Sequence, residues 1–481
     1  MNAGLPRVVI AGAGITGMSA AFHLQSLAKA RRQDLAITVI EADDRIGGKI
    51  QTRVRDGFVL EQGPDSFLAR KSDAVAFIED VGLGDQCIRS RTGQGFIWTG
   101  GRLHPIPAGI RMGIPTRLPP LLGSSLFSPW DKLRLIAGGF RHRDVSGDDQ
   151  PAGRYLRRRF GDALVDRLIE PVLGGIYGGK VDDWSLHAIL PQLGASTARS
   201  YGSRDPVGSR PRPAATTRTA GGQGPFLTLE GGLQTLVTRA AAHLQPGSIL
   251  KHARLKALEI KPDGYRLFVE HGRVLDADAV VLALPSPAAS QLSPMMERIF
   301  QPLQKTPPAS VVLVTFAFRE SDISAAQDGI GFLVPRGAGL ALTACTWSHS
   351  KWPHAAPRGV ALLRCCVGGD SANGLIGQPD QIIAEAVLRD LKWIMAIRGA
   401  AIFYRVTRWA DAIPQYPVGH AERVRRVRST LAEAAPGVFI AGASYDGVGL
   451  PDCIRQGKAA AHRALDHLGQ LAWQSPAHRA A

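Results

Sequence analysis

Apolar residues in this chain come in short runs separated by polar and glycine-rich breaks, which predicts alternating strands and helices. A run at 8–10 predicts a buried strand, the segment from Met18 to about Leu27 a helix, and the alternating residues 36–40 a second strand. Further on, the run at 277–285 predicts a buried parallel strand, and residues 438–468 predict a strand, a glycine turn and a helix. This order is typical of an α/β fold.

Between residues 103 and 187 the apolar residues recur at helical spacing. One set is Leu118, Leu121, Leu122, Leu126, Phe127, Trp130, Leu133 and Ile136, and the second is Leu156, Phe160, Leu164 and Leu168, within a helix predicted from Tyr155 to Leu173. Core packing explains both sets. The alternative is a helical subdomain whose basic, apolar face contacts a membrane surface or shapes a channel for an apolar substrate.

From Val311 to Thr407 the pattern predicts strands and one long helix. We expect strands at 311–318, 331–335, 340–346 and 360–367, and a helix at 379–397. A mostly antiparallel sheet covered by a helix makes a separate substrate domain. The stretch 202–225 is instead rich in Gly, Pro, Ser, Thr and Arg, which predicts a mobile basic surface loop.

Composition excludes several classes of protein. With 481 residues, 45% of them hydrophobic and 20% charged, the chain resembles globular proteins of two or three domains. Its five cysteines are scattered without a Cys-x-x-Cys pair, which argues against a disulfide framework and a metal site. No apolar run approaches the roughly 20 residues that span a bilayer. The first strand leaves no room for a signal peptide, so we expect a cytoplasmic protein.

The formal net charge is +16. We expect no nucleic-acid partner, because the sequence has no helix-turn-helix pattern, zinc spacing or aromatic RNA-binding motif. Two interpretations of the charge remain open. One is attraction to an acidic substrate or an anionic surface, and the other is an Arg-rich composition without a specific partner.

The first predicted strand leads into Gly12-Ala13-Gly14-Ile15-Thr16-Gly17. Gly12 permits a tight turn, Gly14 lets the backbone approach a pyrophosphate, and Gly17 lets the helix pack on the sheet. The start of that helix offers free N–H groups and a positive dipole end to phosphates. Glu41, followed by Ala42, lies 24 residues beyond Gly17, where a carboxylate accepts hydrogen bonds from ribose hydroxyls. The order of these features predicts a Rossmann-like dinucleotide site.

A second glycine pair follows closely, in Arg45-Ile46-Gly47-Gly48-Lys49. This Arg-x-Gly-Gly pattern resembles a recurring mark of flavoproteins in the amine-oxidase superfamily, where the glycines pass close to the pyrophosphate and flavin. The resemblance implies that Arg45, Gly48 and Lys49 bind the cofactor. The alternative for the two basic residues is a solvated turn.

The resemblance becomes specific in Gly63-Pro64-Asp65-Ser66-Phe67-Leu68-Ala69-Arg70-Lys71. After the Gly-Pro turn we expect a helix to begin at Asp65 or Ser66. The segment is similar to the flavin-contacting loop of the bacterial soluble-type protoporphyrinogen and coproporphyrinogen oxidases of haem synthesis. Similar segments lie at 170–179, 343–357, 407–420 and 438–454, so the resemblance extends to about Leu468.

The resemblance implies a set of site residues around a bound FAD. Flavin contacts fall on Gly63, Pro64, Asp65 and Ser66, an adenine-side contact on the backbone near Leu255, and further cofactor contacts on Trp409, Asp446, Val448, Gly449 and Leu450. Arg70 and Lys71 are the candidates for substrate propionates, and Gly175 and Ile176 border the porphyrin cavity. Gly442-Ala443-Ser444 lacks the cysteine that links the flavin in some amine oxidases, so FAD is expected to be noncovalent.

The resemblance also implies a division of the chain into three folded parts and a loop. A discontinuous Rossmann-like FAD-binding domain takes 1–80, 226–295 and 425–470, and a mixed, mostly antiparallel substrate-binding domain takes 81–105, 188–201 and 300–424. A helical subdomain takes 106–187, and the mobile basic loop takes 202–225.

The implied activity is an oxygen-dependent oxidation of a porphyrinogen, in which hydride leaves a meso carbon for flavin N5 and H₂O₂ is released. No side chain is assigned as a catalytic base. Coproporphyrinogen III carries four propionates and protoporphyrinogen IX two, so the strongly basic chain favours the former. The alternatives are protoporphyrinogen oxidation, an amine or carotenoid-type flavin oxidoreductase, and a flavin-binding module without activity. Contacts with a membrane surface and with haem-pathway enzymes are further candidate interactions.

Overall fold

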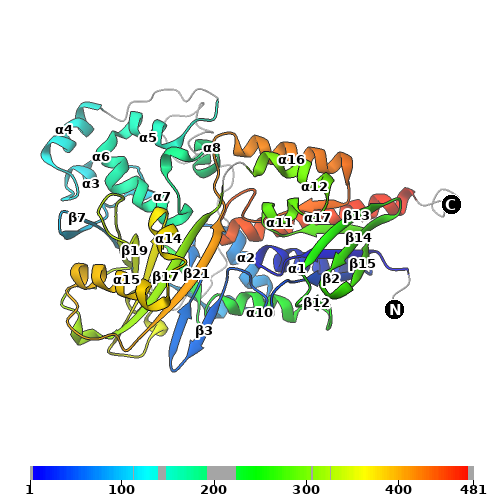
Figure 1. Cartoon of the computed structure of the whole chain (residues 1–481), viewed down its shortest axis with the longest axis horizontal. Helices are drawn as coiled ribbons and strands as arrows, with labels where there is room; N and C mark the ends of the chain where they lie inside the picture. Colours follow the sequence, from blue (N-terminus) through cyan, green and yellow to red (C-terminus); the bar gives the residue numbers. More distant parts are fainter. Residues whose placement is uncertain are drawn as a thin grey trace.

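The structure is a computed structural model that describes residues 4–111, 113–138, 148–191, 224–304, 307–325 and 327–474. The elements gather in two lobes (Figure 1). One lobe holds both ends of the chain and a parallel sheet, and the other holds a sheet of longer strands with short helices beside it. Residues 202–223 of the predicted basic loop lie outside the described residues.

The lobe with the chain ends is built on a five-stranded parallel sheet in the order β12-β2-β1-β16-β22. Its strands are β1 (Arg7–Ala11), β2 (Ala36–Ile40), β12 (Ile249–Leu250), β16 (Ala279–Leu282) and β22 (Val438–Ile440). In the central strand, Val9 lies opposite Thr38 on one side and Val280 on the other. The predicted strands and the α/β fold class are therefore confirmed.

Helices and a small sheet cover the two faces of this parallel sheet. Because side chains alternate along a strand, Val8 and Ile10 enter one core, and Val9 and Ala11 enter the other. The first core is closed by α1 (Ile15–Ala30), α2 (Ser72–Asp80), α10 (Gln234–Ala242) and α17 (Leu450–Gln474). The second is closed by the antiparallel strands β13 (Leu255–Lys261), β14 (Gly264–Val269) and β15 (Val274–Ala277), with α11 (Ser286–Ser290), α12 (Pro294–Phe300) and α16 (His420–Ala434).

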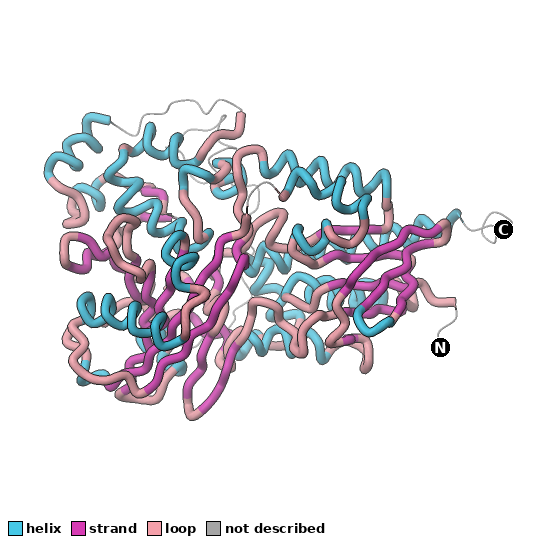
Figure 2. Tube along the Cα trace, viewed as in Figure 1, coloured by secondary structure: helices cyan, strands magenta, loops and turns pink. Residues whose placement is uncertain are grey.

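The second lobe contains a seven-stranded sheet in the order β21-β17-β20-β19-β18-β7-β8 (Figure 2). The strands are β21 (Phe403–Ile413), β17 (Ala309–Arg319), β20 (Val360–Gly368), β19 (Ala344–Trp347), β18 (Gly331–Leu333), β7 (Gly95–Thr99) and β8 (Arg102–Pro105). Only the β18–β7 pair among these is parallel. Helices α14 (Asp370–Leu375) and α15 (Asp380–Met395) pack on one face, and the short helix α13 (Ser348–Lys351) follows β19. The predicted sheet and its covering helix are confirmed.

The helical region beside this sheet differs from the prediction. It comprises α3 (Pro119–Leu122), α4 (Pro129–Gly138), α5 (Ala152–Phe160), α6 (Asp162–Leu164), a π-helical segment Val165–Ile169, α7 (Glu170–Tyr177) and α8 (Leu186–Ile189). One continuous helix from 155 to 173 was wrong, because Gly161 has φ +82° and breaks the helical path. The pattern still identified the core, since Leu156, Phe160, Leu164 and Leu168 are all buried.

Helix α4 leaves three large apolar side chains exposed. Trp130, Leu133 and Ile136 have relative exposures of 74%, 54% and 55%, whereas Leu121 and Leu126 of the same apolar series are buried. Core packing therefore explains only the first part of that series. Membrane contact through this region stays a prediction. In the described parts of the chain, no helix is both long and apolar enough to cross a membrane.

The segment between the hairpin β3 (Thr52–Arg55)–β4 (Phe58–Glu61) and α2 corrects another prediction. No helix begins at Asp65 or Ser66; instead β5 (Phe67–Leu68) pairs with β11 (Phe226–Leu229), and α2 begins only at Ser72. Pairing with β11 keeps this part extended, and β6 (Cys87–Arg89) completes the small sheet. Residues 62–66 are therefore a loop.

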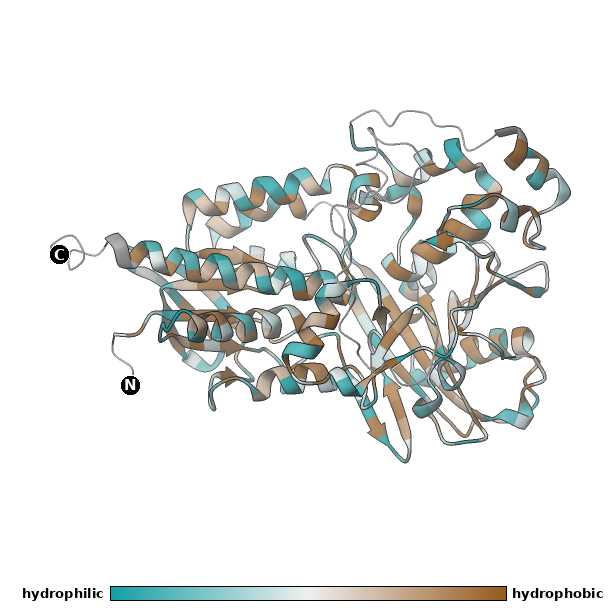
Figure 3. Ribbon diagram, turned by 180° about the vertical axis from the view of Figure 1, so that it is seen from behind, coloured by the Kyte–Doolittle hydropathy of each residue, from teal (hydrophilic) through white to brown (hydrophobic). Residues whose placement is uncertain are grey.

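From behind, Figure 3 shows hydrophobic residues along the strands and hydrophilic ones spread over the long helices.

Candidate functional site

The turn between β1 and α1 is bare backbone. A Cβ on Gly12, whose φ is +99°, would lie 2.7 Å from Ala283 O, and one on Gly17 would lie 1.9 Å from Gly12 O. Gly14 is the N-cap of α1 and offers no side-chain cap, and the first turn contains no acidic residue. The first N–H groups of α1 are therefore available to an anion, as the glycine pattern predicts.

Glu41 lies at the end of β2 and is only 8% exposed. One carboxylate oxygen accepts the N–H of Ala13 at 2.8 Å, and the other accepts the N–H of Asp43 at 3.0 Å. Each oxygen retains a second lone pair, so the carboxylate can fix the turn and still accept a ribose hydroxyl. Ala253 N donates to Glu41 O at 2.7 Å, which brings the segment leading to Leu255 to the same end of the site.

The Arg-x-Gly-Gly turn folds onto the start of α1. Gly47 N donates to Ala13 O at 2.9 Å, and a Cβ on Gly48 would lie 3.2 Å from the Cα of Gly14. The Arg45 guanidinium donates to Gly48 O at 2.6 Å and to Ile50 O at 3.1 Å, whereas Lys49 is exposed. Arg45 therefore shapes its own turn.

The loop Gly63–Ser66 continues from this turn. A Cβ on Gly63 would lie 1.8 Å from Lys49 O, so only glycine lets the loop lie against the preceding segment. Trp409 of β21 donates its Nε1–H to Gln62 O at 2.6 Å. Lys351 and Arg364, two further donors from the seven-stranded sheet lobe, also hold this loop.

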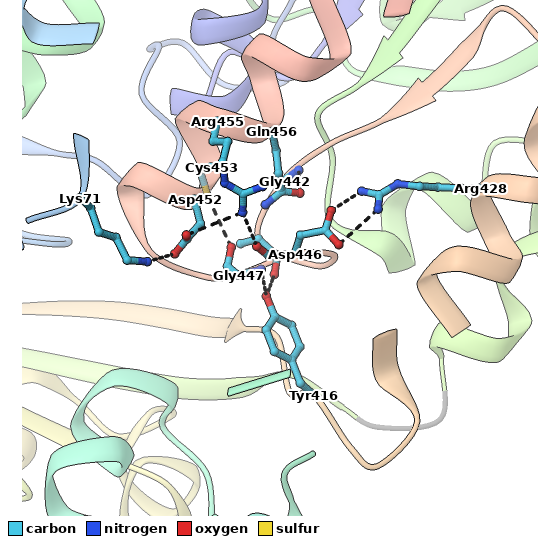
Figure 4. A network of polar contacts seen from close by, with 11 residues as sticks. Lys71, Tyr416, Arg428, Gly442, Asp446, Gly447, Asp452, Cys453, Arg455 and Gln456 are labelled. Atoms are coloured by element: carbon cyan, nitrogen blue, oxygen red, sulfur yellow. Dashed lines mark hydrogen bonds and ion pairs between the residues drawn. The ribbon is translucent and has the colours of Figure 1, made fainter. Parts of the chain in front are cut away.

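A second glycine turn lies between β22 and α17 (Figure 4). Gly442 N donates to Gln456 Oε1 at 3.1 Å, and the hydroxyl of Tyr416 donates to Ala443 O and accepts the N–H of Gly447 at 3.1 Å. The Asp446 carboxylate points to Arg428, with which it forms an ion pair. The side chain of Asp446 is thus engaged with the protein, and the turn itself presents backbone.

Both glycine turns belong to one site because α1 and α17 pack against each other. A Cβ on Gly457 of α17 would lie 2.3 Å from Thr16 O, and one on Gly442 would lie 3.9 Å from Thr16 Oγ1. The start of α17, at Leu450, follows Val448 and Gly449 directly. The structure therefore brings the predicted cofactor residues of the N- and C-terminal segments together, as two helix starts beside two glycine-rich turns.

The candidate substrate residues lie near the start of α17. The Lys71 ammonium is 2.5 Å from the Asp452 carboxylate, and Arg70 is exposed. The ring of Tyr177, at the end of α7, lies 6.3 Å from that of Tyr416, whose hydroxyl accepts the N–H of Gly447, so α7 ends close to the turn before α17. Burial raises the pKa of Tyr177 to about 12. Gly175 and Ile176 lie on that helix, where Ile176 is 38% exposed and a Cβ on Gly175 would contact Leu333 at 3.5 Å. The sequence did not identify Asp452 or Tyr177.

These residues fit a dinucleotide cofactor. The buried carboxylate at one end, the uncapped start of α1 and the row of side-chain-free backbone at Gly14 and Gly48 form a cradle of the right chemistry for ribose and pyrophosphate. Within the described residues, no group of His, Cys, Asp and Glu side chains could hold a metal ion.

Comparison with known proteins gives a consistent result. The sequence matches the family described as flavin containing amine oxidoreductase over residues 15–465. A Bacillus subtilis protein named coproporphyrinogen III oxidase is 40% identical over 97% of this chain and 100% of its own length. A Staphylococcus aureus protein of the same name is 32% identical over 96% and 99%.

The structural comparison agrees with these relatives. A crystal structure of an Exiguobacterium protein described as a protoporphyrinogen oxidase superposes with a TM-score of 0.80 at 37% identity, covering 96% of this chain and 99% of that one. The resemblance inferred from the sequence is thereby confirmed, and with it a flavin-dependent oxidoreductase. The chain belongs to the flavin containing amine oxidoreductase family.

Proposed function

We propose that the chain is an FAD-dependent, oxygen-dependent oxidase that converts coproporphyrinogen III to coproporphyrin III in haem synthesis. The observation that carries this proposal is end-to-end similarity to relatives named coproporphyrinogen III oxidase, at up to 40% identity. The dinucleotide cradle supports it, because every part of that cradle is present in the described residues. The basic charge of +16 supports a substrate with four propionates over one with two.

In this proposal Glu41, Ala42 and the backbone near Leu255 would hold the adenosine, and the start of α1 would hold the pyrophosphate. The loop Gly63–Ser66, Trp409 and the turn before α17 would hold the flavin. When bound, the flavin supplies hydride acceptance from a meso carbon of the macrocycle and electron transfer to O₂, which yields H₂O₂. The start of α17 directs its positive dipole end toward this region.

We propose that FAD is held noncovalently. The residues of the turn after β22 are Gly442, Ala443 and Ser444, and none of them is a thiol. Cys453 is buried, burial raises the pKa of its thiol to about 11, and the thiol donates to Gly447 O at 3.9 Å. A buried, protonated thiol is a poor nucleophile toward a flavin.

Substrate recognition is proposed for Arg70 and Lys71, with Gly175 and Ile176 on the opposing helix. Lys71 already pairs with Asp452, so that a propionate near Lys71 would compete with this carboxylate. Arg70 is exposed, which leaves its guanidinium able to turn toward a substrate carboxylate.

A second candidate is protoporphyrinogen IX oxidation, because the Exiguobacterium structure is described as a protoporphyrinogen oxidase. Anaerobic mixing of the FAD-loaded protein with each porphyrinogen, followed by the loss of oxidised-flavin absorbance, tests both. We expect coproporphyrinogen III to reduce the flavin faster and to turn over faster in air. A large preference for the dicarboxylate would favour the second candidate, and no reduction by either would overturn both.

A further inference from the structure

A buried ion pair connects the two lobes at the loop that follows β4. The Lys351 side chain, at the end of α13, is only 6% exposed. Its ammonium lies 2.7 Å from Asp65 Oδ2 and donates to Ser66 Oγ at 2.8 Å. The same ammonium lies over the rings of Phe226 and Trp352, at 4.6 and 5.1 Å from their centroids. Polar and aromatic partners thus surround a buried ammonium group that has little contact with solvent.

Arg364 of β20 holds the same loop from its other end. Its Nε donates to Glu61 O at 3.2 Å, and its Nη2 donates to Gly63 O. A cavity of about 20 Å³ behind the loop is lined by groups that include Asp65 and Arg364. So small a space admits about one water molecule, so these charges interact in a medium of low polarity.

The charges at this loop do not cancel. Burial alone would raise the pKa of Asp65, but Lys351 and Arg364 outweigh it and hold that pKa well below its usual range. Burial lowers the pKa of Lys351, and the ionised Asp65 opposes this. Burial also raises the pKa of Glu61 to about 7, so near neutrality this carboxyl carries at most part of a charge. Among the described residues at this loop, two cations therefore face one ionised carboxylate, Asp65, and one carboxyl, Glu61, that is only partly charged near neutrality.

The position of the loop relates this charge to the cofactor. Gly48 lies against Gly14 at the start of α1, and Gly63 lies against Lys49, so the loop continues the row of bare backbone away from Glu41. Since Glu41 marks the ribose of the adenosine, the far end of the row is the place for the flavin. This step rests on the flavin of the proposed function and needs no particular substrate.

We propose that Lys351 is a positioning residue which, together with Arg364, fixes the Gly63–Ser66 loop beside the flavin and keeps its surroundings net positive. A positive electrostatic potential at the flavin stabilises the negative charge that reduction adds, and so favours the reduced cofactor. This role gives the segment Thr343–Pro357, in which His349 and His354 have no assigned function, a link to the redox site.

The test is a reductive titration of FAD-loaded variants against a reference dye. Lys351→Met removes one cation, and we expect the equilibrium to move about tenfold toward oxidised flavin. The double variant Lys351→Met/Asp65→Asn also removes the carboxylate and restores the net charge, so its titration should return to that of the wild type. Lys256→Met is the matched control, because the Lys256 side chain on β13 is 53% exposed and pairs with Glu270 at 3.0 Å.

The double variant separates charge from packing. If the role of Lys351 were purely structural, the flavin titration of the double variant would differ from that of the wild type at least as much as the titration of Lys351→Met does. That result would overturn the proposal. A wild-type titration for Lys351→Met would overturn it as well. If Lys351→Met fails to load flavin, Arg364→Gln carries the test, since the amide can still donate to the loop carbonyls while the charge is lost. Its titration should also shift about tenfold toward oxidised flavin, and no shift would overturn the proposal.

These outcomes are independent of the substrate. The titration needs only bound flavin, so a protein that titrates as expected but oxidises no porphyrinogen would retain the role of Lys351 and lose the proposed activity. If the wild type oxidises coproporphyrinogen III but the flavin titrations of the variants do not shift, the proposed activity stands and the role of Lys351 is lost.

Discussion

The two ends of the dinucleotide site are held in different ways. At the Glu41 end, most of the site comes from the first 50 residues, with Ala253 as a distant addition, and the contacts are between backbone groups and one carboxylate. At the Gly63–Ser66 end, the loop is held by long side chains from a different lobe, namely Lys351, Arg364 and Trp409. At Gly12 and Gly17 the first end tolerates no added atom. The second end shares this restriction at Gly63, but the rest of its loop depends on individual hydrogen bonds and charges.

This difference predicts how each end fails. At Gly12 and Gly17 a new Cβ would overlap backbone that cannot relax around it, so substitution there should abolish binding. A loop held by several separate donors should lose affinity in steps as the donors are removed one at a time.

Gly17→Ala should eliminate flavin binding. The added Cβ would lie 1.9 Å from Gly12 O, so β1 and α1 must separate, at a cost of about 3 kcal/mol or more in unfolding free energy. The purified variant should lack the visible absorbance of flavin and refuse added FAD. Gly469→Ala in α17 is the control, because no atom lies within 4 Å of its new Cβ. Full flavin content in Gly17→Ala would contradict a rigid backbone end.

The same contrast explains which parts of the fold the sequence could predict. The strands β1, β2 and β16 and the helix α1 follow from runs of apolar residues and from glycines a few positions apart. The helix expected at Asp65 failed because β11, more than 150 residues later, pairs with residues 67–68 and keeps them extended. The single helix predicted over 155–173 failed at Gly161, whose positive φ a spacing pattern does not reveal.

Prediction of the site shows a similar division. Gly12, Gly14, Gly17 and Glu41 were identifiable because their spacing alone carries the chemistry. Lys351 lies in a segment that the sequence singled out without a role, and its partner Asp65 lies 286 positions earlier. No periodicity connects such residues. The available signal was a lysine between two tryptophans, Trp347 and Trp352, because such apolar neighbours favour burial and lysine is rarely buried unless it is paired.

Glu61 should give the flavin end a pH dependence. Burial raises its pKa to about 7 even though it accepts hydrogen bonds from Leu233 N and Thr52 Oγ1. In the unfolded chain a glutamate titrates near pH 4.3, so the folded protein binds more protons between about pH 4.3 and 7. The contribution of Glu61 to the free energy of unfolding is fully present below about pH 4.3. It falls as the pH rises toward 7, by up to about 1.4 kcal/mol per pH unit.

Urea unfolding of wild type and Glu61→Gln at pH 5, 6, 7 and 8 isolates this contribution, because the other titrating groups are common to both proteins. The variant should gain stability relative to the wild type as pH rises from 5 to 7, and the difference should level off by pH 8. Parallel pH profiles would show that Glu61 does not change its protonation on folding.

Trp409→Phe should have the smallest effect, and it tests whether the flavin end fails in steps. The variant keeps most of the ring but loses the Nε1 donor that bonds Gln62 O at 2.6 Å. Loss of one such bond costs about 1 kcal/mol, or about a fivefold weaker FAD affinity. Lys351 and Arg364 still hold the loop, so the variant should bind FAD, as measured by reconstitution of the flavin-free protein. Trp393→Phe, which changes a 61% exposed side chain on α15, is the matched control. A complete loss of binding in Trp409→Phe alone would show that the flavin end is as intolerant as Gly17, and the contrast between the two ends would fail.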